Sequence, residues 1–281
     1  MFSRKSNIYL LLFILLISVF ILLLAKNDFF SEKEPEINRV ELSSEKLDEI
    51  ISQAVLSRAT GYMDGEFVTE GHIILGKEEK GNNVKVYTVA SLGVYGFENG
   101  IFTTVSGSGS IPTVMEFEAD TQGKWELKEY KEPMDGGGYG DSIKKMFPKK
   151  IYEEIFSGNQ DYYDKLKAQQ KVQAQGYLDS IGREAEIQPG HVEKILSNIN
   201  VEASNKLFAE LTKYDEFLNN CPYWIGTREK IEEGQRFIYE TKQEKTTEGK
   251  DMIIYSKTNE KGEVIEKREY LIEGSEPVLV E

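Results

Sequence analysis

The chain has 281 residues, enough for one or two domains. Its residues are 40% apolar and 29% charged, a composition that is ordinary for a globular protein and excludes wholesale disorder. Its formal net charge is −14. An acidic surface repels the phosphates of nucleic acid and of anionic lipid headgroups, so we expect no nucleic-acid partner, and we interpret the charge as keeping the protein soluble.

An uncharged, mostly apolar run covers residues 8–25, with Arg4 and Lys5 just before it. As a helix this run would span about 27 Å, close to the ~30 Å hydrocarbon core of a bilayer. Because positive flanks stay in the cytoplasm, we expect a single-pass anchor with the rest of the chain outside. The alternative is a cleaved signal peptide and a secreted domain, although Leu23 and Ala25 make a poor small-residue cleavage site.

The polar residues 26–42 indicate a stalk that holds the rest of the chain off the bilayer. A helix is expected next, with Ser43 or Ser44 as its N-cap and Gly61 after its end. One apolar stripe with the spacing i, i+3, i+4, i+7, i+8 is formed by Leu47, Ile50, Ile51, Ala54 and Val55.

Between residues 66 and 130 the apolar period changes to two, which predicts strands. Turns are expected at residues 81–83 and 97–100, where glycine and asparagine gather. The short connections favour antiparallel neighbours, and together with the preceding helix they predict a helix lying on a curved antiparallel sheet.

The pattern becomes helical again between residues 141 and 220. Asp141 or Ser142 is expected to begin a short helix that stops before Pro148. Further helices are expected at 149–156 and 161–181. A last helix is expected after them, with an apolar stripe made by Leu207, Leu211, Tyr214 and Leu218. Alternating residues then predict three final strands, at 237–242, 252–257 and 264–272.

These elements predict an α+β protein: an N-terminal transmembrane helix, a helix on an antiparallel meander sheet, a helical segment, and a C-terminal three-stranded antiparallel meander. The expected boundaries are 1–25 for the cytoplasmic tip and anchor, 26–42 for the stalk, 43–135 for the helix and first sheet, 136–220 for the helical segment and 221–281 for the final strands and tail.

The pair Ser142 and Lys145 matches the S-x-x-K motif of penicillin-recognising proteins, in which a lysine one helical turn after the serine accepts its proton. The companion motifs are poor, because Asn259 stands where Lys257-Thr258 should be followed by glycine. The lysine would have to be neutral in a desolvated pocket, whereas charged residues surround it. We therefore expect Ser142 to cap a helix rather than to accept an acyl group.

No other residue pattern predicts catalysis, a cofactor or a metal. The only two histidines, His72 and His191, lack zinc-ligand spacing. Cys221 is the sole cysteine, so no intramolecular disulfide can form, and we expect it to be a small buried residue. After Pro222, the consecutive Tyr223, Trp224 and Ile225 are expected to anchor the core.

Several segments resemble the extracytoplasmic C-terminal region of clostridial membrane metallopeptidases of the bla-regulator type, over roughly residues 60–272. They are Glu70-Gly71-His72-Ile73-Ile74-Leu75-Gly76, Val84-Lys85-Val86-Tyr87-Thr88, Tyr95-Gly96-Phe97-Glu98-Asn99-Gly100, Val105-Ser106-Gly107-Ser108-Gly109, Ile111-Pro112, Lys144-Lys145-Met146-Phe147-Pro148-Lys149-Lys150, Pro222-Tyr223-Trp224-Ile225-Gly226-Thr227-Arg228-Glu229 and Phe237-Ile238-Tyr239-Glu240. Those relatives carry a multi-helix zinc peptidase before this region, and here a single apolar run stands in its place. The resemblance thus implies an outward-facing module that senses or binds, without peptidase activity.

Three hypotheses for the function follow. The first is a membrane-anchored, non-enzymatic module that binds a ligand or protein of the cell envelope. The second is an envelope hydrolase or an acyl-accepting, β-lactam-sensor-like protein that uses Ser142 and Lys145. The third is a purely structural envelope protein. A deep pocket with clustered polar groups would favour the first two, and a filled core with a convex surface would favour the third.

Overall fold

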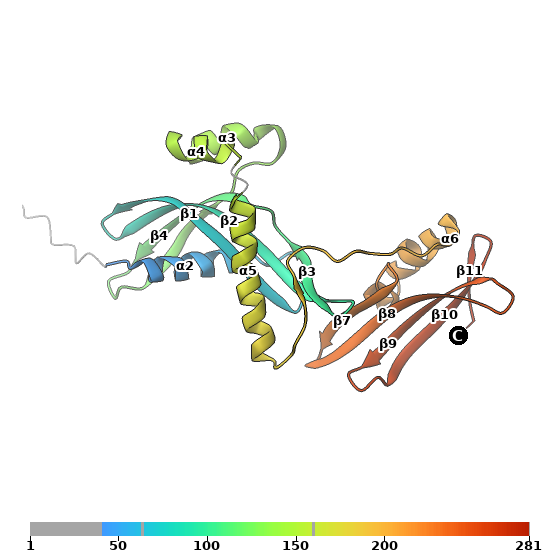
Figure 1. The fold of residues 1–281 in the computed structure, drawn as a ribbon. Coiled ribbons are helices and arrows are strands. Elements are labelled where there is room, and N and C mark those ends of the chain that lie inside the picture. The colour runs from blue at the N-terminus through green and yellow to red at the C-terminus, as the bar shows by residue number, and fades with distance from the viewer. Residues whose placement is uncertain (1–40, 63–64, 159–160, 281) are drawn as a thin grey trace, which may run out of the picture. The chain divides into compact units, whose positions relative to one another are not determined.

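The computed structural model describes residues 41–62, 65–158 and 161–280, and it confirms a mixed α+β fold with a large antiparallel sheet and several helices (Figure 1). The expected anchor, residues 8–25, and nearly all of the expected stalk lie outside the described residues. Within the described residues, no helix combines the length and apolar character needed to cross a membrane.

The long strand β2 (Asn83–Glu98) organises the first part of the sheet. One edge of β2 pairs with β1 (Phe67–Lys80), and the other pairs with β4 (Ile111–Ala119) and then β3 (Ile101–Gly107), all antiparallel. Strand β5 (Trp125–Lys131) adds to β4, and the two-residue β6 (Ile187–Gln188) lies parallel to β3. The sequence predicts alternating burial along this strand, but almost all of β2 is buried because helices cover both of its faces.

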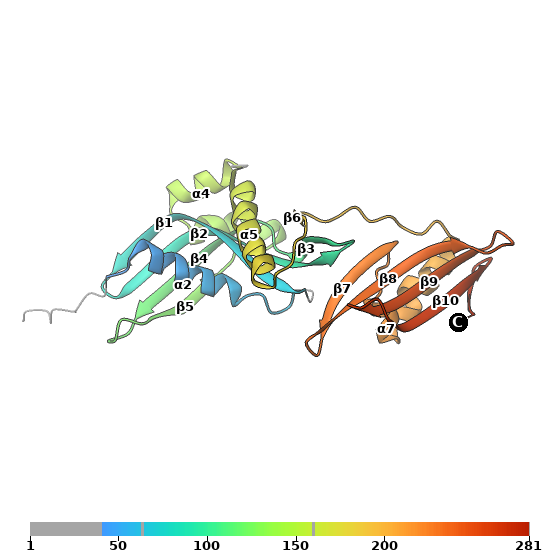
Figure 2. The same ribbon diagram turned by 60° about the horizontal axis from the view of Figure 1, so that its bottom comes forward.

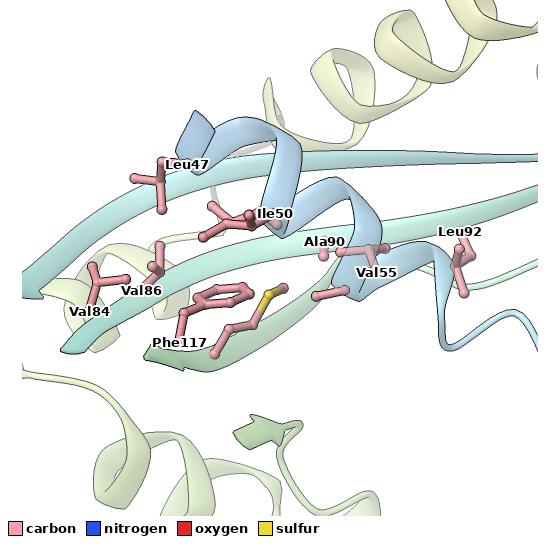
Figure 3. Packing of buried hydrophobic residues seen from close by; sticks show 11 residues of the cluster. Leu47, Ile50, Val55, Val84, Val86, Ala90, Leu92 and Phe117 are labelled. Carbon is pink, nitrogen blue, oxygen red and sulfur yellow. The ribbon is translucent and has the colours of Figure 1, made fainter. Parts of the chain in front are cut away.

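Helix α2 (Ser44–Leu56) covers one face of β2, and the predicted apolar stripe is confirmed, since all five of its residues are buried (Figure 3). The hydroxyl of Ser43 accepts a hydrogen bond from the backbone N–H of Lys46, which caps the helix. The resulting core joins α2 to alternate residues of β2 and β4, namely Val84, Val86, Ala90, Leu92, Met115 and Phe117.

Three helices cover the opposite face: α3 (Tyr139–Met146), α4 (Lys149–Phe156) and α5 (Asp161–Ser180). Helix α3 begins at Tyr139, earlier than predicted. Helix α5 lies very close to the sheet, and glycines permit this. A Cβ on Gly71 would come within 2.8 Å of the Leu166 carbonyl oxygen, and one on Gly93 within 2.9 Å of the Gln170 side chain.

Two glutamines of α5 pair with the outer edge of β1, the edge that does not face β2. The side-chain amide of Gln169 accepts from the backbone N–H of His72 at 2.7 Å and donates to the carbonyl of the same residue at 3.0 Å. Gln173, one helical turn later, makes the same double contact with Glu70, at 3.0 and 2.7 Å. We call these four contacts the glutamine ladder. They fix α5 to β1 by hydrogen bonds as well as by apolar packing.

The C-terminal part contains five strands rather than the three predicted. They are β7 (Gly226–Glu232), β8 (Gln235–Lys245), β9 (Asp251–Asn259), β10 (Val264–Glu273) and β11 (Glu276–Leu279), each antiparallel to the next. A pairing of Glu98 with Arg228 joins β7 to the end of β2, so all strands belong to one sheet. The extra strands flank the predicted ones and carry charged, half-buried residues that weaken the apolar alternation.

Short helices cover one face of this C-terminal part, between α6 (Val201–Asn205) and α7 (Glu216–Asn220) (Figure 2). The sequence predicts one continuous helix here, and that prediction is wrong. Asp215 caps α7 by accepting from the Leu218 N–H, which starts a new helix. Leu207 and Leu218 are buried as expected, but Tyr214 is 93% exposed.

Candidate functional site

A cavity of about 410 Å³ opens beside the junction of β2 and β7. Phe97, Val105 and Phe208 supply its apolar wall. Its polar lining comes from the short helices, from β7 and from the segment between them, and comprises Thr212, Asn219, Asn220, Tyr223, Arg228, Glu229 and Lys230. Small-molecule sites combine apolar walls with convergent polar groups that fix the orientation of the ligand, and both kinds of surface are present here.

Arg228 and Lys230 give this cavity its charge. They are two residues apart on β7 and pair across the sheet with Tyr239 and Phe237, so their side chains share one face and their Cα atoms lie roughly 7 Å apart. Two cations at this spacing can both reach one anionic group or the two ends of a small dianion.

The guanidinium of Arg228 donates no hydrogen bond to any residue that the structure describes. Its contacts are an ion pair with Glu98 at 3.8 Å and the ring of Trp224, whose centroid lies 4.8 Å from the guanidinium carbon. Burial lowers the pKa of Arg228, and the charge of Glu98 opposes that shift. An arginine remains protonated nevertheless, so the cavity holds a cation with unused hydrogen-bond donors.

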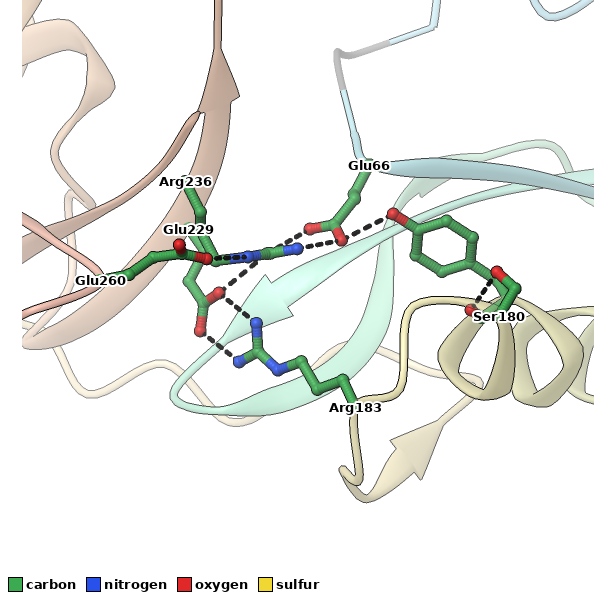
Figure 4. A network of polar contacts seen from close by, with 7 residues as sticks. Glu66, Ser180, Arg183, Glu229, Arg236 and Glu260 are labelled. Atoms are coloured by element: carbon green, nitrogen blue, oxygen red, sulfur yellow. Dashed lines mark hydrogen bonds and ion pairs between the residues drawn. The ribbon is translucent and has the colours of Figure 1, made fainter. Parts of the chain in front are cut away.

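Lys230 also lacks a hydrogen-bonded carboxylate partner among the described residues. Its ammonium group donates to the neutral amide oxygen of Asn220 at 2.8 Å and forms no ion pair within the described part of the chain. The neighbouring Glu229 also lines the cavity, but its carboxylate binds Arg183 and Arg236 on the other face of β7 (Figure 4). Lys230 therefore keeps a positive charge that no described carboxylate binds directly.

Glu98 lies behind Arg228 and is fully buried. One of its oxygens is 3.4 Å from the Lys194 ammonium and the other 3.8 Å from Arg228, and neither accepts a hydrogen bond within the described residues. Lys194 also lies 4.0 Å above the Trp224 ring. A buried carboxylate held only by charge is costly, and such groups occur preferentially near functional sites.

A second polar cluster joins α2 to β1. His72 has one ring nitrogen 3.0 Å from Glu70 and the other 3.4 Å from Asp48. Burial opposes protonation of His72, but the two carboxylates outweigh it and raise the pKa. A protonated imidazole donates from both nitrogens and therefore suits both partners. This geometry makes His72 a link between two elements of the fold.

The residues of the S-x-x-K motif do not form a site in the structure. The Ser142 hydroxyl donates to the Tyr139 carbonyl at 2.8 Å and accepts from the Met134 N–H at 3.0 Å. It thus lies inside α3 rather than at its N-cap, and Lys145 is exposed and makes no hydrogen bond to Ser142. The hydroxyl orders the loop that precedes α3 instead of the helix start.

The other residues singled out in the sequence also lie apart. Among the described residues, no group of three or more His, Cys, Asp or Glu could hold a metal ion. His191 is exposed, and Cys221 is buried, which raises the pKa of its thiol to about 12. Trp224 is fully buried as predicted, but Tyr223 is 52% exposed and packs edge-on against it, so the prediction for Tyr223 is wrong.

Sequence reasoning missed Arg228 and Lys230. Their signal is weak: two cations at i and i+2 in a strand occur on many solvated faces. What distinguishes them is that neither donates a hydrogen bond to a carboxylate of the described residues, since the adjacent Glu229 pairs with Arg183 and Arg236 instead. No family model matches this chain, and neither a curated protein nor a solved structure matches it.

Proposed function

We propose that this chain is a non-enzymatic binding module for a small organic anion, with the cavity beside Arg228 and Lys230 as its binding site. One observation carries the proposal: two cations, neither of which donates a hydrogen bond to a carboxylate of the described residues, line a cavity that also has an apolar wall of Phe97, Val105 and Phe208. A ligand with a carboxylate or phosphate group and an apolar body would satisfy both kinds of surface.

The anchoring of this module is part of the proposal. Residues 8–25 serve as a single-pass anchor with the N-terminus inside, and the module senses its ligand outside the cytoplasm. The resemblance to the outer region of bla-regulator-type metallopeptidases supports an outward-facing sensor without a peptidase. An enzymatic role for Ser142 and Lys145, or a purely structural role, accounts less well for two cations in a cavity that are not hydrogen-bonded to any described carboxylate.

Protease added to intact spheroplasts tests the topology. We expect digestion of the chain after Lys26, because everything beyond the apolar run lies outside. Complete protection of the module while an external marker protein is digested would contradict this arrangement.

Calorimetric titration of the full chain with phenylacetate and with phenyl phosphate tests the ligand class. We expect both to bind, and 2-phenylethanol, which has the same ring without the charge, to bind at least about tenfold more weakly, since charge-assisted hydrogen bonds contribute about 1.5–3 kcal/mol. Arg228→Gln and Lys230→Gln should each weaken anion binding by about tenfold or more, and added salt should weaken it in the native protein.

The matched control is Lys242→Gln, which removes the same charge from an exposed lysine paired with Glu240. Its binding should equal that of the native protein. Equal binding of the anions and of 2-phenylethanol, or equal losses in Lys242→Gln and Arg228→Gln, would show that the cavity does not select anions.

A further inference from the structure

A second cavity, of about 290 Å³, lies over the other part of the sheet, where α3, α4 and the start of α5 meet β2 and β4. Its floor is the cross-strand pair of Val89 and Pro112. Its walls include three tyrosines from two helices: Tyr139 from α3, and Tyr162 and Tyr163 from the first turn of α5. The volume suits a ligand of about one ring, since drug-sized sites span about 300–1,000 Å³.

The lining of this cavity is uncharged. Ser110, Ile155 and Gly158 complete it, so none of the described residues that line it carries a charge, although 29% of the whole sequence does. A neutral, aromatic lining excludes the ion-pair recognition that the cavity beside Arg228 offers. It favours an uncharged ligand with apolar faces.

Hydroxyl groups line the same cavity, and several of them can still form hydrogen bonds with a ligand. The hydroxyls of Tyr139, Tyr163 and Ser110 make no hydrogen bond within the part of the chain that the structure describes. Tyr162 donates to the Glu154 carboxylate at 2.5 Å, which fixes its ring. Tyr139 and Tyr163 are 37% and 52% exposed, so a ligand can reach them. The Lys167 ammonium lies over the Tyr163 ring, 5.8 Å from its centroid, which leaves the other face of that ring for a ligand.

We infer that this tyrosine-lined cavity binds a neutral saccharide. One face of a pyranose ring presents C–H groups that pack against the electron-rich face of an aromatic ring, and its rim presents hydroxyls that need hydrogen-bond partners. Tyr163 and Tyr139 supply the stacking surface, and the hydroxyls of Tyr139 and Ser110 supply partners. A proline-rich peptide also uses aromatic grooves, but it brings no hydroxyl groups to pair with these.

Saturation-transfer NMR on the full chain tests this inference, with cellotriose, maltotriose and triacetylchitotriose as probes. The chain is kept in a zwitterionic detergent, because a detergent with a sugar headgroup would compete. We expect at least one trisaccharide to receive saturation on its ring C–H protons. Tyr163→Ala and Tyr139→Ala should each weaken that binding by about tenfold, whereas Tyr163→Phe, which keeps the ring, should retain most of it.

Tyr214→Ala is the control, because Tyr214 is 93% exposed and does not line this cavity. It should bind the trisaccharide as the native protein does, and circular dichroism of all four variants should match the native spectrum. Absence of saturation transfer to every trisaccharide, or binding that Tyr163→Ala and Tyr139→Ala leave unchanged, would overturn the inference. So would binding of a proline decapeptide in place of the saccharides.

Discussion

Replacing Trp224 by alanine is expected to lower the free energy of unfolding by about 3–5 kcal/mol. The indole is fully buried. It also lies under the Lys194 ammonium, 4.0 Å away, and near the Arg228 guanidinium, 4.8 Å away. The substitution would leave a cavity, and it would remove the aromatic ring that two partly desolvated cations contact. Both effects lower the free energy of unfolding.

Urea denaturation of the full chain, followed by tyrosine fluorescence and circular dichroism, measures this loss. The neighbour Tyr223 gives a matched control, because it is also a large aromatic residue but is 52% exposed. Tyr223→Ala should shift the denaturation midpoint much less than Trp224→Ala does. Similar midpoints for the native protein and Trp224→Ala would show that the indole does not anchor the β2–β7 junction.

Replacing Arg236 by alanine is expected to destabilise the protein by about 3–5 kcal/mol, because it leaves buried carboxylates without their partner. Arg236 binds Glu66 through two hydrogen bonds, at 2.6 and 2.5 Å, and Glu229 at 2.9 Å (Figure 4). Both carboxylates are more than nine-tenths buried. Among the described residues, Glu229 would keep Arg183, whereas Glu66 would keep only the hydroxyl of Tyr177. Most of the loss should therefore arise at Glu66.

The same denaturation experiment tests Arg236, with two further variants. Lys245→Ala removes a largely exposed partner of Asp251 and should cost about 0–1 kcal/mol. Adding Glu66→Gln to Arg236→Ala should recover part of the stability, because it removes the uncompensated charge. If Arg236→Ala behaves like Lys245→Ala, or if Glu66→Gln brings no recovery, the network does not stabilise the protein in this way.

The parts of the fold that follow from local pattern could be predicted. The stripe of α2 needs only its own residues to define the buried face, and the Asn99-Gly100 turn needs only a pair that tolerates positive φ. Burial along β2 could not be predicted, because it depends on helices 40 or more residues later in the chain. The break before α7 depends on the cap at Asp215, which competes locally with a continuous apolar stripe.

The candidate site was harder to predict than the fold, since its character depends on contacts that are distant in sequence. Arg228 is a candidate because the carboxylate of Glu98, 130 residues earlier in the chain, lies 3.8 Å from its guanidinium and accepts no hydrogen bond from it. Ser142, by contrast, matches a motif through its spacing alone, and its hydroxyl is used by Tyr139 and Met134. The spacing of a motif shows only that the right residue types are present. Whether their side chains can bind a ligand depends on which hydrogen-bond donors the fold leaves without a partner.

The glutamine ladder affects whether molecules of this protein associate through their β-strands. An outer strand offers unpaired N–H and C=O groups to which the strand of another molecule can add, and this is a common start of aggregation. A glutamine amide presents one donor and one acceptor, like a peptide unit, so Gln169 and Gln173 occupy the positions that an incoming strand would use at His72 and Glu70. Further along the same edge stand Lys77, Glu78, Glu79 and Lys80, whose charges discourage such addition. Helix α5 thus protects β1 from self-association as well as supporting it.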